Sequence, residues 1–180
     1  MIIKKTEFDG LFVILTRIHK DERGYLFESY AKNHNDIPGI RLYHFNHEIV
    51  SVSNKNVFRG LHFQTQPDSQ GKLVQVLSGE VLDVVVDIRK SSKTFGAYYM
   101  TALNNEVHEG YQRQLWIPPG FAHGFLSLTD DTVFHYKCTQ PREASAERIL
   151  SIKEFDFGWN YDELIMSEKD KNGITLGELK

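Results

Sequence analysis

The sequence predicts an all-β fold, a jelly-roll barrel with short helices near the C-terminus. Most apolar residues fall in short runs at regular intervals between turn-forming residues, which is typical of β-sandwiches and barrels. A histidine after a glycine turn, His62, is followed later by Pro118-Pro119-Gly120 and His123, and this arrangement indicates a jelly roll with both histidines in one barrel mouth. At 180 residues the chain is expected to form a single domain over residues 1–180.

Charge and composition exclude several classes of protein. The formal net charge is -3 and no lysine and arginine run forms a basic surface, so no nucleic acid partner is expected. The first apolar stretches are too short and too interrupted by charge for a signal peptide or membrane span, so we expect a cytoplasmic protein without a membrane partner. The single cysteine, Cys138, fits a reducing compartment and is interpreted as a small buried residue.

The first third of the chain is predicted to form short strands. Residues 1–3 and 11–15 are apolar runs on either side of a turn-prone Asp-Gly pair, and residues 25–30 alternate after a turn. Residues 33–40 are polar and predict a short helix or a loop, whereas residues 42–53 return to strand-like spacing.

The stretch 57–87 joins the clearest strand pattern to the only tight cluster of chemically useful side chains. That cluster spans fourteen residues and consists of Arg59, His62, Gln64 and Lys72. Dense aliphatic and β-branched residues follow, bounded by Gly71 and Gly79. We therefore predict a hairpin that carries a polar site.

The rest of the chain alternates loops and strands. Its predicted elements are a loop at 89–95, a strand at 96–103, an exposed polar turn at 104–112, a strand at 132–138 and short helices in the last forty residues. Two prolines and two glycines around His123 predict a shaped turn that presents this side chain. Strand 132–138 places Phe134 and Tyr136 on one face and His135 and Lys137 on the other.

Two histidines in a barrel mouth first suggest a metal site, but the spacing opposes one. Metal-binding cupins share this predicted topology and take their ligands from a His-x-His pair plus a carboxylate. Here His62 is followed by Phe63-Gln64, and two ligands alone hold a metal poorly. No metal is therefore expected.

Without a metal, His62 is a candidate general base. Because Arg59 and Lys72 are close in the sequence, this interpretation has about the same weight as that of a hydrogen-bonded histidine near the core. Lys72 is either an oxyanion stabiliser or a solvated lysine at a strand end. Tyr136 is either a core tyrosine, which the pattern slightly favours, or a proton donor that faces the cavity.

Other polar residues carry weaker signals. Arg23 and Arg59 each lie beside a glycine and could bind phosphates, although surface arginine is the commoner explanation for either one. Lys169 and Asp170 read by composition as solvent-exposed tail.

Taken together, these motifs resemble the dTDP-4-dehydrorhamnose 3,5-epimerase family, dimeric sugar-nucleotide enzymes of the cupin superfamily. The resemblance rests on motifs in the family's order: Asp21-Glu22-Arg23-Gly24, Arg59-Gly60-Leu61-His62-Phe63-Gln64, Gln70-Gly71-Lys72-Leu73-Val74, Gly79-Glu80-Val81, Val86-Asp87-Ile88-Arg89, Arg113-Gln114-Leu115-Trp116-Ile117-Pro118, Gly120-Phe121-Ala122-His123-Gly124-Phe125, Tyr136-Lys137 and Ser167-Glu168-Lys169-Asp170.

The resemblance implies a role for each of these residues. His62 becomes the base, oriented by Asp170, Tyr136 becomes the acid on the opposite face, and Lys72 faces the 4-keto oxygen of the sugar. The residues expected at the sugar nucleotide are Arg23, Glu28, Arg59, His123, Glu147 and Lys169. The resemblance further implies a homodimer, a nucleotide-sugar substrate and catalysis without a cofactor, because the 4-keto group itself acidifies the hydrogens at C3 and C5.

The sequence departs from the family at the nucleotide end. The family's Gln-Asp-Asn-His-Ser is replaced by His47-Glu48-Ile49-Val50-Ser51, and its Tyr-Tyr pair by Pro141-Arg142 after Gln140. An arginine plane stacks on a nucleobase differently from a tyrosine ring. His47 and Arg142 are therefore expected at an altered nucleotide site.

Several alternatives remain open. The enzyme could invert one carbon only, or act on a CDP-, GDP- or UDP-linked 4-keto sugar, and a 3,4-ketoisomerase fits the motifs less well. A catalytically silent sugar-nucleotide-binding cupin does not explain why His62, Lys72, Tyr136 and Asp170 are all present. A metal-dependent cupin dioxygenase lacks its ligand set.

Overall fold

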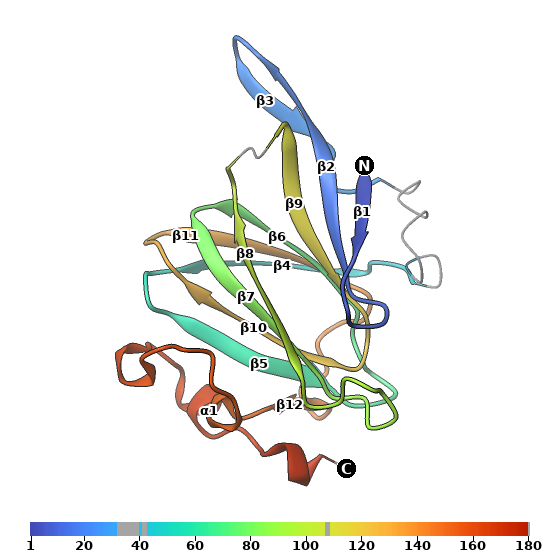
Figure 1. The fold of residues 1–180 in the computed structure, drawn as a ribbon, viewed down its shortest axis with the longest axis vertical. Helices are drawn as coiled ribbons and strands as arrows, with labels where there is room; N and C mark the ends of the chain where they lie inside the picture. Colours follow the sequence, from blue (N-terminus) through green and yellow to red (C-terminus); the bar gives the residue numbers. More distant parts are fainter. Residues whose placement is uncertain (32–39, 41–42, 107–108, 180) are drawn as a thin grey trace.

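The computed structural model describes residues 1–31, 40, 43–106 and 109–179, and these form two antiparallel β-sheets (Figure 1). The strands of the first sheet are β1 Ile2–Lys5, β2 Phe12–Asp21, β3 Gly24–Phe27, β4 His47–Ser53, β6 Lys72–Ser78, β9 Tyr111–Ile117 and β11 Thr132–Cys138. Those of the second are β5 Phe58–Gln64, β7 Glu80–Asp87, β8 Tyr98–Asn104, β10 Phe121–Ser127 and β12 Glu147–Ile149. The predicted all-β jelly-roll fold is confirmed.

Strand order follows from pairings between segments that are distant in the sequence. Among the described residues, the first sheet runs β1-β2-β9-β6-β11-β4 with β3 paired to β2, and the second runs β12-β5-β10-β7-β8. After β12 the described chain forms short helices, η3 Ile152–Glu154, η4 Tyr161–Glu163, α1 Glu168–Lys171 and η5 Leu176–Glu178. No helix in the described part of the chain is long and apolar enough to cross a membrane.

The predicted central hairpin is wrong. Strands β6 and β7 are consecutive, yet β6 pairs with β9 and β11 in one sheet while β7 pairs with β8 and β10 in the other. Between them, Gly79 has φ +86°, and a Cβ there would lie 2.5 Å from Thr129 Oγ1. The glycine therefore turns the chain from one sheet to the facing sheet instead of closing a ladder.

The other predicted elements agree with the structure except at their ends. Predicted strand 25–30 stops at Phe27, strand 42–53 begins only at His47, and the loop at 89–95 is confirmed. Most of the predicted helix or loop at 33–40 and part of the turn at 104–112 lie outside the described residues. Cys138 is buried as predicted.

The space between the sheets holds the main apolar core. Strands β6, β9 and β11 of the first sheet supply Val74, Val76, Leu115, Ile117 and Phe134, and strands of the second supply Val81, Val85, Leu103, Phe121 and Phe125. The alternation predicted for β11 is confirmed, because Phe134 and Tyr136 face this core while His135 and Lys137 contact Glu48 on the outer face.

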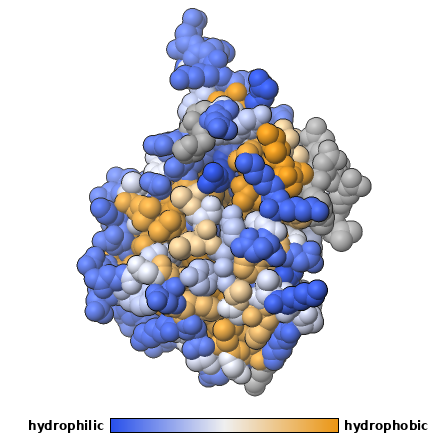
Figure 2. Space-filling view, in the orientation of Figure 1, coloured by the Kyte–Doolittle hydropathy of each residue, from blue (hydrophilic) through white to orange (hydrophobic). Residues whose placement is uncertain are grey.

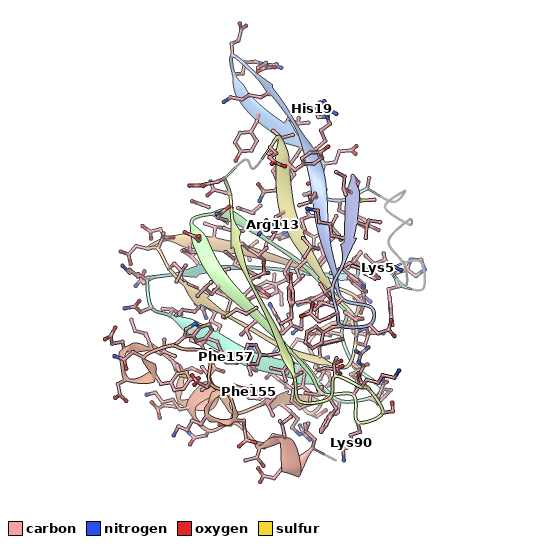
Figure 3. All side chains as sticks on the ribbon, in the orientation of Figure 1. Lys5, His19, Lys90, Arg113, Phe155 and Phe157 are labelled. Carbon is pink, nitrogen blue, oxygen red and sulfur yellow. The ribbon has the colours of Figure 1, made fainter. Side chains whose placement is uncertain are left out.

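The C-terminal segment covers the outer face of the second sheet (Figure 1). Phe155 and Phe157 stack at a centroid distance of 5.5 Å and pack under β5 with residues such as Phe58 and Leu61 (Figure 3). This packing matters for the site, because it fixes the segment that carries α1 against β5.

The hairpin of β2 and β3 projects from the barrel (Figure 1). Its tip is hydrophilic, and hydrophobic surface appears on the barrel below it (Figure 2). Behind the tip, however, Tyr25 and Leu26 are 45% and 66% exposed.

Candidate active site

A cavity of about 200 Å³ lies between the two sheets, and both sheets line it. The lining residues are Ile49, Ser51, Arg59, His62, Phe63, Gln64, Gln70, Lys72, His123, Tyr136, Cys138, Arg142 and Glu147. His62 and His123 are register partners on β5 and β10, so the prediction that they share one barrel mouth is confirmed. His123 lies within β10, however, and not at the predicted turn.

His62 is held by a carboxylate that is distant in the sequence. Its Nε2 lies 2.6 Å from Asp170 Oδ1, so the ring N–H donates to the carboxylate and Nδ1 keeps the lone pair that can accept a proton. The Ser167 hydroxyl accepts a hydrogen bond from the Asp170 amide at the start of α1, which fixes the aspartate. Asp170 is 5% exposed, so the composition-based interpretation of this residue as solvent-exposed tail is wrong.

Lys72 begins β6 and reaches into the cavity. The preceding Gly71 allows close packing, since a Cβ there would lie 2.6 Å from the Trp116 ring. Lys72 Nζ donates to the His62 carbonyl at 3.3 Å. Burial lowers the pKa of the Lys72 ammonium, while the negative charges of Glu147 and Asp83 oppose this change. Lys72 is therefore not a solvated lysine at a strand end.

Tyr136 both packs against the core and lines the cavity, so the two interpretations of this residue are compatible. Burial raises the pKa of its phenol well above the ordinary value, and the charge of Asp83 raises it further. The phenol therefore keeps its proton at neutral pH and can act as a donor. Because Tyr136 lies in the first sheet and His62 in the second, the two face the cavity from opposite sides.

A second histidine–carboxylate pair, not predicted from the sequence, lies under the cavity. His123 Nε2 donates to Asp83 Oδ2 at 2.8 Å, and their side chains are 1% and 0% exposed. Burial lowers the pKa of His123, although Asp83 opposes the shift. The His123 ring packs edge-on against Tyr136 at 6.0 Å. A charged residue inside the apolar run Leu82-Asp83-Val84-Val85-Val86 was the signal that could have revealed the pair.

We call these residues the floor of the cavity: His62, Lys72, His123 and Tyr136, with Asp83 and Asp170 behind them. The mouth consists of Arg142, Glu147 and Lys169. Arg142 Nη2 donates to Glu147 Oε2 at 2.8 Å, and Lys169 pairs with the same carboxylate. Hydrogen bonds from the two cations, the larger from Arg142, lower the pKa of Glu147 to about 2, so it is ionised at neutral pH.

The loop that carries Arg142 is fixed by two glutamines. Gln70 Nε2 donates to the Gln140 carbonyl at 2.8 Å, and the Glu143 amide donates to Gln64 Oε1 at 2.8 Å. Arg142 therefore extends from a well-anchored turn with its Nε and Nη2 edge occupied by Glu147.

Arg59 connects the second sheet to the edge of the first. Its Nε donates to Ser53 Oγ at 2.9 Å and its Nη2 to the Val52 carbonyl at 3.1 Å, and the side chain lines the cavity.

Three predicted site residues are not brought to the cavity within this chain. Arg23 and Glu28 lie on or just after the projecting hairpin, and the Arg23 side chain is 85% exposed and pairs with Asp21. His47 starts β4 but does not line the cavity, whereas Ile49 two residues later does. Of the altered nucleotide-end residues, Ile49 and Arg142 are thus at the cavity.

The donor set does not fit a metal. Within the described residues, no three His, Cys, Asp or Glu side chains gather as a possible metal site. Each cavity histidine already gives one ring nitrogen to a carboxylate.

This chain is similar in sequence and in fold to known proteins of one family. A family model described as dTDP-4-dehydrorhamnose 3,5-epimerase matches residues 5–178. A protein of that description from Shigella flexneri is 41% identical over 96% of this chain and 94% of its own length. A crystal structure of a dTDP-6-deoxy-D-glucose-3,5-epimerase from Legionella pneumophila, in complex with dTDP-4-keto-L-rhamnose, matches with a TM-score of 0.87 and 37% identity over 99% of this chain and 94% of that one.

A structure with a narrower activity is also similar. The 3'-monoepimerase from Streptomyces bikiniensis, in complex with dTDP-quinovose, matches with a TM-score of 0.84 and 28% identity over 96% of this chain and 86% of that one. The family model nevertheless covers almost the whole chain, and the relative from Shigella flexneri aligns over nearly its full length. The chain belongs to the dTDP-4-dehydrorhamnose 3,5-epimerase family.

Proposed function

We propose that this protein epimerises a dTDP-linked 4-keto-6-deoxyhexose at C3 and C5 through an enolate, without a cofactor. The observation that carries the proposal is the placement of a carboxylate-held histidine and a protonated tyrosine on opposite sides of one cavity, with a lysine beside them. Inversion at carbon needs a base on one side of the sugar and an acid on the other. The floor supplies both.

The chemistry follows from the ketone at C4, which acidifies the neighbouring C–H bonds. His62 removes the proton as the electrons move onto the C4 oxygen, and the Lys72 ammonium stabilises the negative charge there. Tyr136 then donates its proton to the same carbon from the opposite face. His123, held by Asp83, packs against the tyrosine and keeps its ring in place.

The mouth is suited to the nucleotide. A cavity of about 200 Å³ is smaller than the roughly 300–1,000 Å³ typical of sites that enclose a whole ligand, so it suits the sugar and leaves the nucleotide at the opening. Arg59 and Lys169 are the cations for the diphosphate. The flat guanidinium of Arg142, with one edge held by Glu147, offers its face to the base.

Proton NMR in deuterated water with dTDP-4-keto-6-deoxyglucose tests the proposal. We expect the C3 and C5 proton signals to disappear as both carbons exchange with solvent. Loss at one carbon only would indicate a monoepimerase. Exchange with a CDP-, GDP- or UDP-linked sugar and not with the dTDP sugar would move the proposal to that nucleotide, and nucleotide-sugar binding with no exchange on any substrate would favour a silent binder.

We also propose a homodimer in which the hairpin of one subunit brings Arg23 and Glu28 to the site of its partner. Support comes from the projection of this hairpin from the barrel (Figure 1). The exposure of Tyr25 and Leu26 behind its tip also supports the proposal. Within one chain, neither Arg23 on the hairpin nor Glu28 just after it lines the cavity described above.

Mixing two inactive variants tests this arrangement. In a mixed dimer of Arg23→Ala and His62→Ala subunits, one site combines an intact His62 with an intact Arg23 from the other subunit, so activity should return. If Arg23 acts only in its own subunit, no mixture recovers activity. Light scattering measures the oligomeric state in parallel, and a monomer would refute the dimer.

A further inference from the structure

The hydroxyl of Ser51 is a cavity group to which the proposed mechanism gives no role. Ser51 lies on β4 and lines the cavity with Arg59 and Tyr136. Its Oγ is shielded from solvent and makes no hydrogen bond of normal geometry with the described residues. Buried hydroxyls almost always have a hydrogen-bond partner. The Ser51 hydroxyl is therefore suited to bind a group whose protonation state changes during the reaction.

Strand register brings this hydroxyl to Tyr136. On the paired strands β4 and β11, Tyr136 is opposite Ile49 and Phe134 is opposite Ser51, so Ser51 and Tyr136 are diagonal neighbours on the cavity face. Against the effect of burial, the Ser51 hydroxyl and the nearby Arg59 charge both lower the pKa of the Tyr136 phenol. Both groups therefore stabilise the phenolate that forms when Tyr136 gives up its proton.

Ser53 is a second serine on the same strand as Ser51. It lies two residues from Ser51, on the same face of β4, and its Oγ accepts a hydrogen bond from Arg59 Nε at 2.9 Å. The Arg59 guanidinium is thus held close to the serine and the tyrosine. Ser53 is engaged by Arg59, whereas Ser51 is not.

After each inversion the enzyme holds one proton too many on His62 and one too few on Tyr136, and the Ser51 hydroxyl is placed to correct the second of these. Each inversion moves one proton from carbon to His62 and one from Tyr136 to carbon, which leaves an imidazolium and a phenolate. A second inversion needs His62 to lose its proton to water and the phenolate to regain one. We propose that Ser51 is the relay for this return: its Oγ–H gives the proton to the Tyr136 phenolate while the serine oxygen takes one from a water molecule that enters the cavity once the sugar has left. The hydroxide that remains is neutralised by the proton that His62 releases.

This inference rests on the proposed function, and pre-steady-state exchange in deuterated water separates the two. The first inversion starts from a protonated Tyr136 and needs no relay, whereas every later one does. In Ser51→Ala we expect a burst of about one deuterium per active site at a rate within about twofold of the unmodified enzyme, followed by a phase at least tenfold slower. The unmodified enzyme should show no such burst.

Several measurements make the outcome decisive. Ser51→Thr keeps the hydroxyl, so its later turnovers should be as fast as those of the unmodified enzyme. In Ser51→Ala, a small buffer acid such as imidazolium should accelerate the slow phase. The matched control Ser53→Ala removes a hydroxyl from the same face of β4 and should alter the KM through Arg59 without producing a burst. Equal slowing of both phases, or no slowing, would refute the relay. Absence of exchange in the unmodified enzyme would instead refute the proposed function.

Discussion

The floor and the mouth of the cavity hold charge in different ways. In the floor, the His123 and Asp83 side chains are 1% and 0% exposed, so the surrounding core fixes their geometry. In the mouth, Arg142 and Lys169 are 56% and 57% exposed around Glu147. Buried groups cannot exchange their partners without a large cost, whereas exposed ion pairs contribute little and rearrange easily. The floor is therefore suited to positioning, whereas in the mouth Lys169 can exchange Glu147 for the phosphates of a ligand.

Removing the base should have the largest effect on activity. His62→Ala is expected to lower kcat roughly 10²–10⁴-fold, because general-base catalysis contributes a factor of that size. Hydrogen exchange at C3 and C5, followed by NMR, measures it. Little packing is lost, so the melting temperature should change by only a few degrees.

The matched control for this variant is His44→Ala, an exposed histidine in the segment before β4. His44 does not line the cavity, and its removal should leave exchange intact. Undiminished exchange in His62→Ala would refute the assignment of the base.

Breaking the buried pair of the floor should have the largest effect on stability. Asp83→Ala leaves His123 buried without its partner and should lower the free energy of unfolding by about 2–3 kcal/mol. Urea denaturation at neutral pH measures the loss. Asp83→Asn keeps an acceptor and should lose less, and equal stability of the three proteins would contradict a structural role for the pair.

The mouth should respond more weakly, and in binding more than in turnover. Arg142→Ala is expected to weaken dTDP binding roughly fivefold, about 1 kcal/mol, with a smaller change in the turnover of bound substrate. Calorimetric titration with dTDP measures the first quantity. Lys171→Ala, which removes an exposed cation paired with Glu168, is the control, and an unchanged affinity in Arg142→Ala would show that this residue does not contact the nucleotide.

The smallest expected effect is the pH dependence of the stability that the ion pairs of Glu147 contribute. Because the pKa of Glu147 falls from 4.5 to about 2 on folding, its ion pairs add stability above about pH 4.5 and lose it as the pH falls toward 2. Exposure of both cations limits the contribution to about 1 kcal/mol or less. Thermal melts of the unmodified protein and Glu147→Gln should therefore differ slightly at pH 7 and converge near pH 2. A difference that grows toward low pH would contradict the assignment.

Local sequence patterns predicted much of this molecule. Alternation in residues 132–138 correctly separated Phe134 and Tyr136 from His135 and Lys137, because the side-chain period of a strand is two whatever its neighbours are. The glycine turn before His62, together with the later Pro118-Pro119-Gly120 and His123, correctly predicted a shared cavity. For the roles of the cavity residues, the sequence offered family resemblance and several open alternatives.

Strand partners and long-range contacts were decided only by the tertiary structure. Alternation specifies which face of a strand is buried but not which strand lies beside it, so β6 and β7 looked like a hairpin although each belongs to a different sheet. By local composition Asp170 looked like exposed tail, and only the family resemblance linked it to His62. Packing of the C-terminal segment on β5 is what brings it to that histidine, 108 residues away in the sequence. Asp83 shows the same division: the sequence places a carboxylate in an apolar strand, and only the folded chain supplies the histidine that makes its burial tolerable.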